Sequence, residues 1–284
     1  MMMAAAPRKL TLCADDYGIS EGVNRAIRDL IAQGRLNATS VMVVTPAFTR
    51  DEIAALKTLR QRVVSEDGRR CALGLHVTLT APFRPLTLHF RPLSGEQFLS
   101  LNATLARAML RRFDVEIVRA EILAQLTAFI EAFGTPPDFV DGHQHVQIFP
   151  VLRDAFIDAV KEKAPDAWVR QCGAPQGAAP VGLKARLLDH LSKGFRAKAA
   201  KAGLTFNPAF SGAYDFTRAP DFASLFPGFL QGLPDGALIM CHPGFVDDTL
   251  RSLDPFTDQR EREHAYFASD AFADLLTAEN TTLL

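Results

Sequence analysis

Three features that mark particular classes of protein are scarce or missing in this sequence. Its 284 residues carry 31 Lys and Arg against 32 Asp and Glu, a formal net charge of -1, so no basic surface for nucleic acid is expected. No apolar run approaches the roughly 18 residues that cross a bilayer, so no membrane span is predicted. The first residues lack a charged head followed by a long apolar stretch. Residues 1–8 are therefore predicted to be a short disordered lead rather than a signal peptide.

Cysteine is also scarce. The four residues are Cys13, Cys71, Cys172 and Cys241, and none forms a CxxC pair. A disulfide framework is not expected at this size and density. Cys13 and Cys241 lie in apolar runs, where a buried, reduced thiol is the usual finding. This usage predicts a cytoplasmic protein with cysteines in its core.

Strand-like and helix-like segments alternate along the chain without a Ser- or Gly-rich linker or an internal repeat. Predicted strands lie at residues 9–14, 39–44, 72–79, 139–143, 168–171, 204–206, 237–241 and 281–284. Predicted helices lie at 20–34, 49–62, 115–133, 151–163, 183–191, 219–231 and 261–276. This order indicates a parallel sheet with helices outside. Seven or eight strands in this length favour a (β/α) barrel over the alternative, an open doubly wound sheet.

One segment, residues 81–112, interrupts the alternation. It contains Pro82, Pro85 and Pro92 and is too long for a plain connection between a strand and a helix. We therefore expect a single domain over residues 9–284, with an insertion at about 81–112 lying over one face.

The richest cluster of chemically active side chains is the run from Asp141 to His145, which contains Asp141, His143 and His145 within five residues. In an extended chain alternate side chains share a face, so the three are predicted to point the same way. Histidine is the commonest transition-metal ligand and titrates near neutral pH. The run therefore suggests a metal site, although a turn cap and a solvated histidine remain the alternative.

Other candidates also fall at the carboxyl ends of predicted strands. Asp15 and Asp16 follow the first strand, His76 ends the third and His242 follows the seventh. In a barrel these ends converge on one mouth, where enzymes of this architecture place their chemistry. The alternatives are an N-cap for an aspartate and a satisfied, hydrogen-bonded position for each histidine.

Residue type suggests which chemical role each of these candidates can take. Adjacent carboxylates repel unless a cation compensates them, and one of Asp15 and Asp16 can bind a metal while the other acts as a base. Two histidines and one carboxylate leave coordination positions open for water and substrate. His242 precedes Pro243 and Gly244, which hold a fixed turn, so it can stay unligated and donate a proton.

Four segments together resemble the YdjC-like (ChbG/HpnK-type) carbohydrate deacetylase family, within the wider polysaccharide-deacetylase-like barrels. They are CADDYGIS at 13–20, GLHVTLT at 74–80, PPDFVDGHQHVQIFP at 136–150 and MCHPGFVDD at 240–248. The resemblance runs in order from about residue 9 to the end. It implies a deformed barrel, a divalent metal, removal of acetyl groups from N-acetylated sugars, and a homodimer.

Position by position, the resemblance implies a role for each site residue. The implied metal ligands are Asp16, His76 and His143, the implied base is Asp15 and the implied acid is His242. His145, Asp141 and Arg170 are expected to touch substrate or support the ligands. The chain departs from the family at Tyr17, where Phe is common, and at Gln144 and Gln147, where many relatives carry His; the glutamines bear on sugar preference.

Several alternatives stay open at this stage. The metal is expected to be Zn or Mg, with Ni or Co also compatible. A metal-dependent hydrolase of another amide, an ester or a phosphoester is the first rival, although no P-loop or basic phosphate cluster is present. A sugar- or metal-binding protein without catalysis is the second. Substrate contacts are expected from residues 81–112 and 173–180, with Phe83, Phe90 and Trp168 as candidates for stacking on sugar rings and core packing as their alternative.

Overall fold

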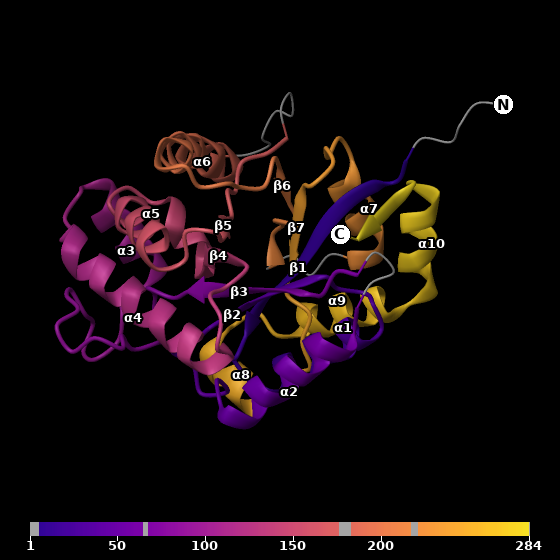
Figure 1. Ribbon diagram of the computed structural model, residues 1–284, viewed down its shortest axis with the longest axis horizontal. Helices are drawn as coiled ribbons and strands as arrows, with labels where there is room; N and C mark the ends of the chain where they lie inside the picture. The colour runs from indigo at the N-terminus through magenta and orange to yellow at the C-terminus, as the bar shows by residue number, and fades with distance from the viewer. Residues whose placement is uncertain (1–5, 65–67, 176–182, 217–220, 284) are drawn as a thin grey trace.

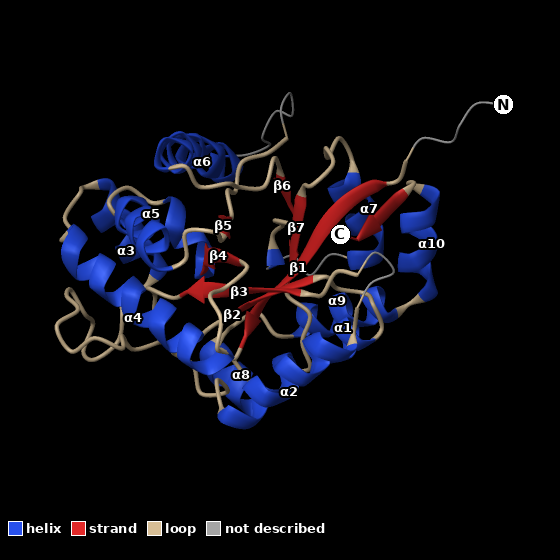
Figure 2. Cartoon of the chain, in the orientation of Figure 1, coloured by secondary structure: helices blue, strands red, loops and turns tan. Residues whose placement is uncertain are grey.

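The structure is a computed structural model that describes residues 6–64, 68–175, 183–216 and 221–283, with the backbone alone for 183–185. The strands lie in the middle of the molecule and the helices surround them (Figures 1 and 2). The strands are β1 Arg8–Tyr17, β2 Ala38–Val41, β3 Ala72–Val77, β4 Phe139–Gly142, β5 Trp168–Val169, β6 Phe210–Ser211, β7 Leu238–Cys241 and β8 Thr281–Leu283. All of their pairings are parallel, in the order β5-β4-β3-β2-β1-β7-β6, and β8 pairs with the start of β1.

The two ends of this sheet curl toward each other. Val169 of β5 forms an isolated parallel bridge with Phe206, and the backbone N–H of Phe210 donates to the carbonyl of Gly173 at 3.1 Å. Between these contacts the Asn207 side chain bonds the backbone N–H and carbonyl of Gln171, at 2.9 and 3.1 Å. The predicted deformed (β/α) barrel is therefore confirmed, and a side chain replaces strand pairing at its seam.

Helices and irregular segments cover the outside of the sheet (Figure 1). The helices are α1 Glu21–Ala32, α2 Arg50–Arg62, α3 Leu101–Met109, α4 Val115–Phe133, the 3-10 turn η1 His143–Ile148, α5 Leu152–Lys163, α6 Leu183–Ala202, α7 Phe222–Leu230, α8 Asp248–Leu253, α9 Asp258–Ala268 and α10 Asp270–Ala278. Side chains cap the first two helices: Ser20 Oγ accepts from the N–H of Val23 and Thr49 Oγ1 accepts from the N–H of Glu52. Within the described ranges no helix is long and apolar enough to cross a membrane.

Two predicted elements are not formed as predicted, and several others differ in their bounds. The predicted strand at residues 204–206 is wrong, because Phe206 makes only a single bridge and the Asn207 side chain replaces further pairing; β6 starts at Phe210. The predicted single helix over 261–276 is also wrong. Ser269 adopts extended backbone and its hydroxyl bonds the carbonyl of Tyr266, which ends α9 before α10 begins.

Residues 81–100 form irregular chain beside α4, followed by α3. The buried Glu121 carboxylate of α4 accepts the backbone N–H groups of Leu86 and Thr87 at 3.0 and 2.9 Å. Gln125, one turn later, bonds both the N–H and the carbonyl of Thr78. One face of α4 thus holds this segment against the end of β3, next to the candidate site.

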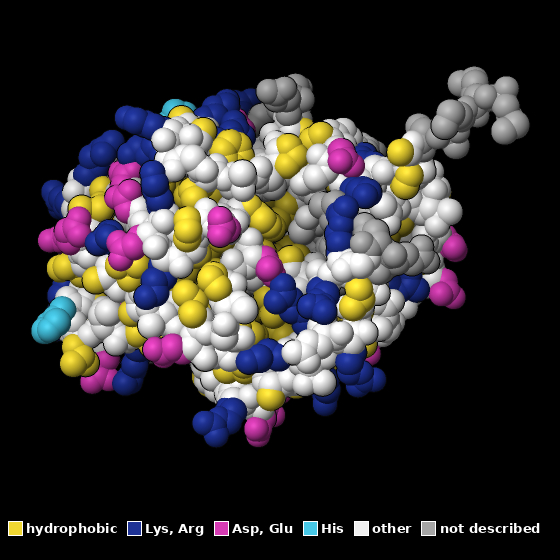
Figure 3. All heavy atoms as spheres, viewed as in Figure 1, with side chains coloured by type: hydrophobic (Ala, Val, Ile, Leu, Met, Phe, Trp, Pro, Cys, Tyr) yellow, Lys and Arg dark blue, Asp and Glu magenta, His cyan; other side chains and the backbone are white. Residues whose placement is uncertain are grey.

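The first five residues of the predicted disordered lead lie outside the described residues. On the face shown in Figure 3, basic and acidic side chains of the described residues are interspersed, in keeping with the balanced composition.

Candidate metal centre and active site

The carboxyl ends of β1, β3, β4 and β7 bring the candidate residues together. The aspartates were predicted to follow the first strand, but they lie within β1, because pairing with β2 continues to Tyr17 across a shift in register. Within that irregularity Asp16 has a φ of 69°, a left-handed conformation that aspartate tolerates better than most residues. Irregularities of this kind re-aim side chains, and here the two neighbouring carboxylates meet different partners.

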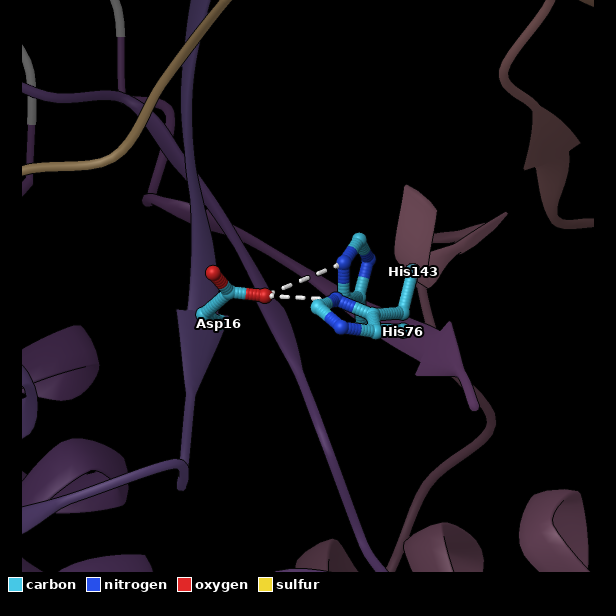
Figure 4. A group of neighbouring side chains, drawn as sticks. All are labelled: Asp16, His76 and His143. Carbon is cyan, nitrogen blue, oxygen red and sulfur yellow. Dashed lines mark hydrogen bonds and ion pairs between the residues drawn. The ribbon is translucent and has the colours of Figure 1, made fainter. Parts of the chain in front are cut away.

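Three side chains, from β1, β3 and the start of η1 directly after β4, converge on one point. Asp16 Oδ1 lies 3.0 Å from His143 Nδ1 and 3.4 Å from His76 Nε2. Figure 4 shows both imidazoles turned toward the same carboxylate oxygen. Zinc bonds of about 2.0–2.2 Å at tetrahedral angles place ligand atoms roughly 3.4 Å apart. The donor set and its spacing therefore fit a divalent cation with positions left for water and substrate.

The ring nitrogen of His76 that does not face Asp16, Nδ1, fixes the orientation of the ring. Nδ1 lies 2.6 Å from Asp141 Oδ1 and 3.0 Å from Ser40 Oγ. Burial lowers the pKa of His76, but Asp141 and the other nearby carboxylates outweigh it and raise that pKa to about 10. A hydrogen on Nδ1 that bonds Asp141 leaves Nε2 for a cation, the carboxylate–histidine arrangement typical of metal sites. A cation there competes with a proton, as for any ligating imidazole.

Arg170 lies completely buried between Asp15 and Asp141. Its two terminal nitrogens each lie 2.6 Å from an oxygen of Asp15, and Nη2 lies 2.5 Å from Asp141 Oδ2. Burial alone would raise the pKa of Asp15, but the guanidinium holds it below its ordinary value. Cys13, Asp15 and Asp141 form a second close group. Arg170 already supplies the positive charge there, so the first group, Asp16, His76 and His143, is better suited to a cation.

His242 follows β7 and is half-buried. Its backbone N–H donates to Glu263 Oε2 at 2.5 Å, and its ring meets Phe216 edge-on at 5.2 Å. Nδ1 has no hydrogen-bond partner in the part of the chain that the structure describes. Burial lowers the pKa of the imidazole, while Asp16 and Asp15 oppose that effect. The ring is thus placed among the site carboxylates without being one of the three converging ligands.

His145 does not share a face with His143, which corrects the prediction from alternation. β4 ends at Gly142, and Gln144 and His145 have left-handed φ values of 54° and 60°, so the extended chain on which the prediction depended is missing. His145 instead lies 3.6 Å from Cys172 Sγ and meets Phe210 edge-on. Burial and the Arg170 charge lower the pKa of His145 to about 3, so it is neutral.

Of the three aromatic residues predicted to stack on sugar rings, two pack in the core and one lies beside the site. Trp168 stacks on Phe139 at 4.4 Å and Phe90 packs edge-on with Phe98 at 4.9 Å, so both serve the core. Phe83 meets His143 edge-on at 5.9 Å and borders the site. Of the predicted substrate loop at 173–180, residues 176–180 lie outside the described residues.

Sequence reasoning missed several residues that complete the site. Arg260 of α9 contacts Asp16 Oδ2 at 2.6 Å, and Asp254 contacts the same guanidinium. Tyr214 donates to Glu263 Oε1 at 2.5 Å, and Ser40 reaches both His76 and Asp15. Arg260 and Glu263 lie in the run DQREREH, whose many charges are typical of a solvated helix. Only their spacing of three residues, which puts them on one helix face, offered a signal.

The family profile described as YdjC-like protein matches residues 9–278. This chain belongs to the YdjC-like family. A solved structure from Enterococcus faecalis V583, provisionally described as a cellobiose-phosphate cleavage protein, is 17% identical with a TM-score of 0.74, covering 98% of this chain and 97% of that one.

Two further solved structures are similar to the YdjC-like chain with lower TM-scores. A peptidoglycan N-acetylglucosamine deacetylase is 9% identical with a TM-score of 0.52, covering 97% of this chain and 85% of that one. A lactam utilization protein from Thermus thermophilus is 18% identical with a TM-score of 0.51, covering 94% and 96%. These similarities establish the shared fold.

Proposed function

We propose that this YdjC-like protein is a metal-dependent carbohydrate N-deacetylase, which hydrolyses the acetamide of an N-acetylated sugar to acetate and an amino sugar. The observation that carries the proposal is the convergence of Asp16, His76 and His143 on one point, with Asp15 and His242 beside them. The fold shared with a peptidoglycan N-acetylglucosamine deacetylase supports the substrate class.

The three converging side chains would hold the cation. Two imidazole nitrogens and one carboxylate oxygen suit zinc, whereas magnesium prefers oxygen ligands alone; nickel and cobalt also accept imidazole. A divalent cation at this place supplies Lewis-acid polarisation of the acetamide carbonyl.

Asp15 is the proposed base that takes a proton from the attacking water. Arg170 keeps it ionised, which is the form a base requires. Oδ1 accepts from both Arg170 and Ser40, whereas Oδ2 accepts, among the described residues, from Arg170 alone and retains a lone pair for the water proton. The same ion pair fixes the direction of the carboxylate, because the guanidinium engages both oxygens. Asp15 therefore faces the site with a defined geometry.

His242 is the proposed acid that gives a proton to the departing amine. An amine leaves poorly unless it is protonated as the carbon–nitrogen bond breaks. The negative charges of Asp15 and Asp16 favour a proton on His242 against the effect of burial on its pKa. The fixed turn at Pro243 and the bond from the His242 N–H to Glu263 keep the ring in place.

Acetate release is the decisive measurement. Purified protein is incubated with N-acetylglucosamine oligosaccharides, with and without a phosphate group, after chelation and after return of Zn²⁺, Mg²⁺, Ni²⁺ or Co²⁺. The expected result is acetate and amino sugar in equal amounts, lost on chelation and restored by a metal. Phosphate release, or ester cleavage without acetate from any N-acetyl sugar, would favour the rival hydrolase. Metal binding without turnover of any of these compounds would favour a binding protein.

A further inference from the structure

We propose that Arg260 is a positioning residue that restricts Asp16 to a single metal-binding oxygen. This inference rests on the metal site of the proposed function. The two oxygens of Asp16 face different partners. Oδ1 lies 3.0 Å from His143 Nδ1 and 3.4 Å from His76 Nε2, whereas Oδ2 lies 2.6 Å from Arg260 Nη2.

The Arg260 guanidinium is itself held firmly. Nη2 also lies 2.5 Å from Asp254 Oδ2, and Nε donates to the carbonyl of Phe256 at 3.2 Å. The backbone carbonyl of Arg260 accepts the N–H of Gly244 at 3.1 Å. Arg260 is 3% exposed. The loop after β7 thus contacts the Arg260 backbone, while Asp254 and Phe256 hold its side chain where Nη2 contacts Asp16 Oδ2.

Asp16 Oδ2 and Arg260 Nη2 form a buried ion pair, with both side chains at most 3% exposed. One carboxylate oxygen is therefore committed to the guanidinium. Carboxylates bind divalent metals through one oxygen or two. An oxygen that accepts a charge-assisted bond from Arg260 is withheld from the metal.

The contact between Arg260 and Asp16 affects how many coordination positions remain open at the cation. A catalytic zinc site needs a position for water or substrate beyond its three protein ligands. A second bond from Asp16 would occupy such a position. Arg260 thus reserves it, from a helix that contributes no ligand. It is not a catalytic residue, since it contacts a ligand rather than the reacting atoms.

Two variants test whether a cation in contact with Oδ2 is required. Arg260→Met removes the charge and frees Oδ2. Arg260→Lys keeps a cation, and one ammonium can stand where Nη2, a single nitrogen, contacts both Asp16 and Asp254. Arg119→Met is the matched control, because Arg119 pairs with Glu162 and Glu116 on the outside of α4.

Each protein is loaded with Co²⁺, whose visible absorption weakens as the coordination number rises. Arg260→Met is expected to lose intensity, while Arg260→Lys and Arg119→Met keep the wild-type spectrum. An unchanged spectrum for Arg260→Met overturns the inference.

A crystal structure of wild-type protein loaded with Zn²⁺ tests the same point without relying on a variant that folds. The expected result is Oδ1 on the metal and Oδ2 on Arg260. Two Asp16 oxygens on the metal would overturn the inference alone, provided that wild-type protein still releases acetate. Failure of wild-type protein to bind any divalent metal would overturn the proposed function as well.

Discussion

Asp141 Oδ1 lies 2.6 Å from Nδ1 of His76, and the two residues are direct partners across the parallel pair β3 and β4. Strand register therefore sets the ring orientation of a proposed metal ligand. The other oxygen of Asp141 contacts Arg170, which in turn holds Asp15. A buried chain of ionic contacts thus connects the proposed ligand to the proposed base.

Asp141→Asn is expected to weaken metal binding by about 10- to 100-fold, the usual effect of removing a partner that orients a ligating histidine. The amide keeps the shape but lacks the charge that favours Nδ1–H toward it. Competition with a chromophoric chelator measures the affinity. Asp138→Asn is the control, since Asp138 lies at the opposite end of β4 and bonds Arg60 and the N–H of Leu73. Equal losses in both variants would contradict a specific role for Asp141.

Asp15→Asn is expected to retain metal affinity within a few-fold and to lower kcat by roughly 10²- to 10⁴-fold, the range for loss of a general base. An amide oxygen still accepts from Arg170 but cannot take the proton of water. Acetate release on a verified substrate gives kcat, and chelator competition gives the affinity. Full activity in this variant would remove Asp15 from the mechanism.

The pair His143→Gln and His145→Gln tests which histidine of the 143–145 segment binds the metal. His143 Nδ1 faces Asp16 Oδ1, whereas His145 faces Cys172 and Phe210. His143→Gln is therefore expected to lose stoichiometric metal and activity together. His145→Gln is expected to keep the metal, as judged by metal analysis after dialysis. The reverse pattern would move the site to His145.

The parts of the site that the sequence predicted are those attached to strand ends. Asp16, His76 and His143 come from three apolar runs that each end in a polar side chain, and parallel strands bring such ends together. The barrel itself followed from the alternation of elements. The convergence of the strand ends needed only short-range pattern and the rule that parallel strands present their carboxyl ends at one edge. The choice of Asp16, His76 and His143 as ligands came from the resemblance to the family.

The features that the sequence did not predict depend on contacts between distant segments or on single backbone angles. The left-handed turn at Gln144 and His145 cannot be read from residue types that also suit a strand. The place of Arg260 depends on a long-range contact, because its side chain extends from α9 to Asp16, 244 residues earlier in the chain. The replacement of strand pairing by Asn207 likewise appears only when the sheet has curled.

Glu263→Gln tests a buried carboxyl that supports His242. Glu263 is fully buried and accepts from the His242 N–H and the Tyr214 hydroxyl. Burial raises its pKa from 4.5 to about 7. Between these values the folded state binds more protons than the unfolded state, so this group's contribution to stability is complete below pH 4.5 and falls as pH rises toward 7.

Glutamine resembles the protonated acid and does not titrate. The stability of Glu263→Gln relative to wild type is therefore expected to improve between about pH 4.5 and about pH 7.5, by at most roughly 3 kcal/mol from the difference in pKa. Denaturant unfolding at several pH values measures it. Glu261→Gln is the control, because it removes a carboxylate that is exposed on the same helix. A constant difference for Glu263→Gln would show that Glu263 stays ionised in the fold, held by its two donors despite burial.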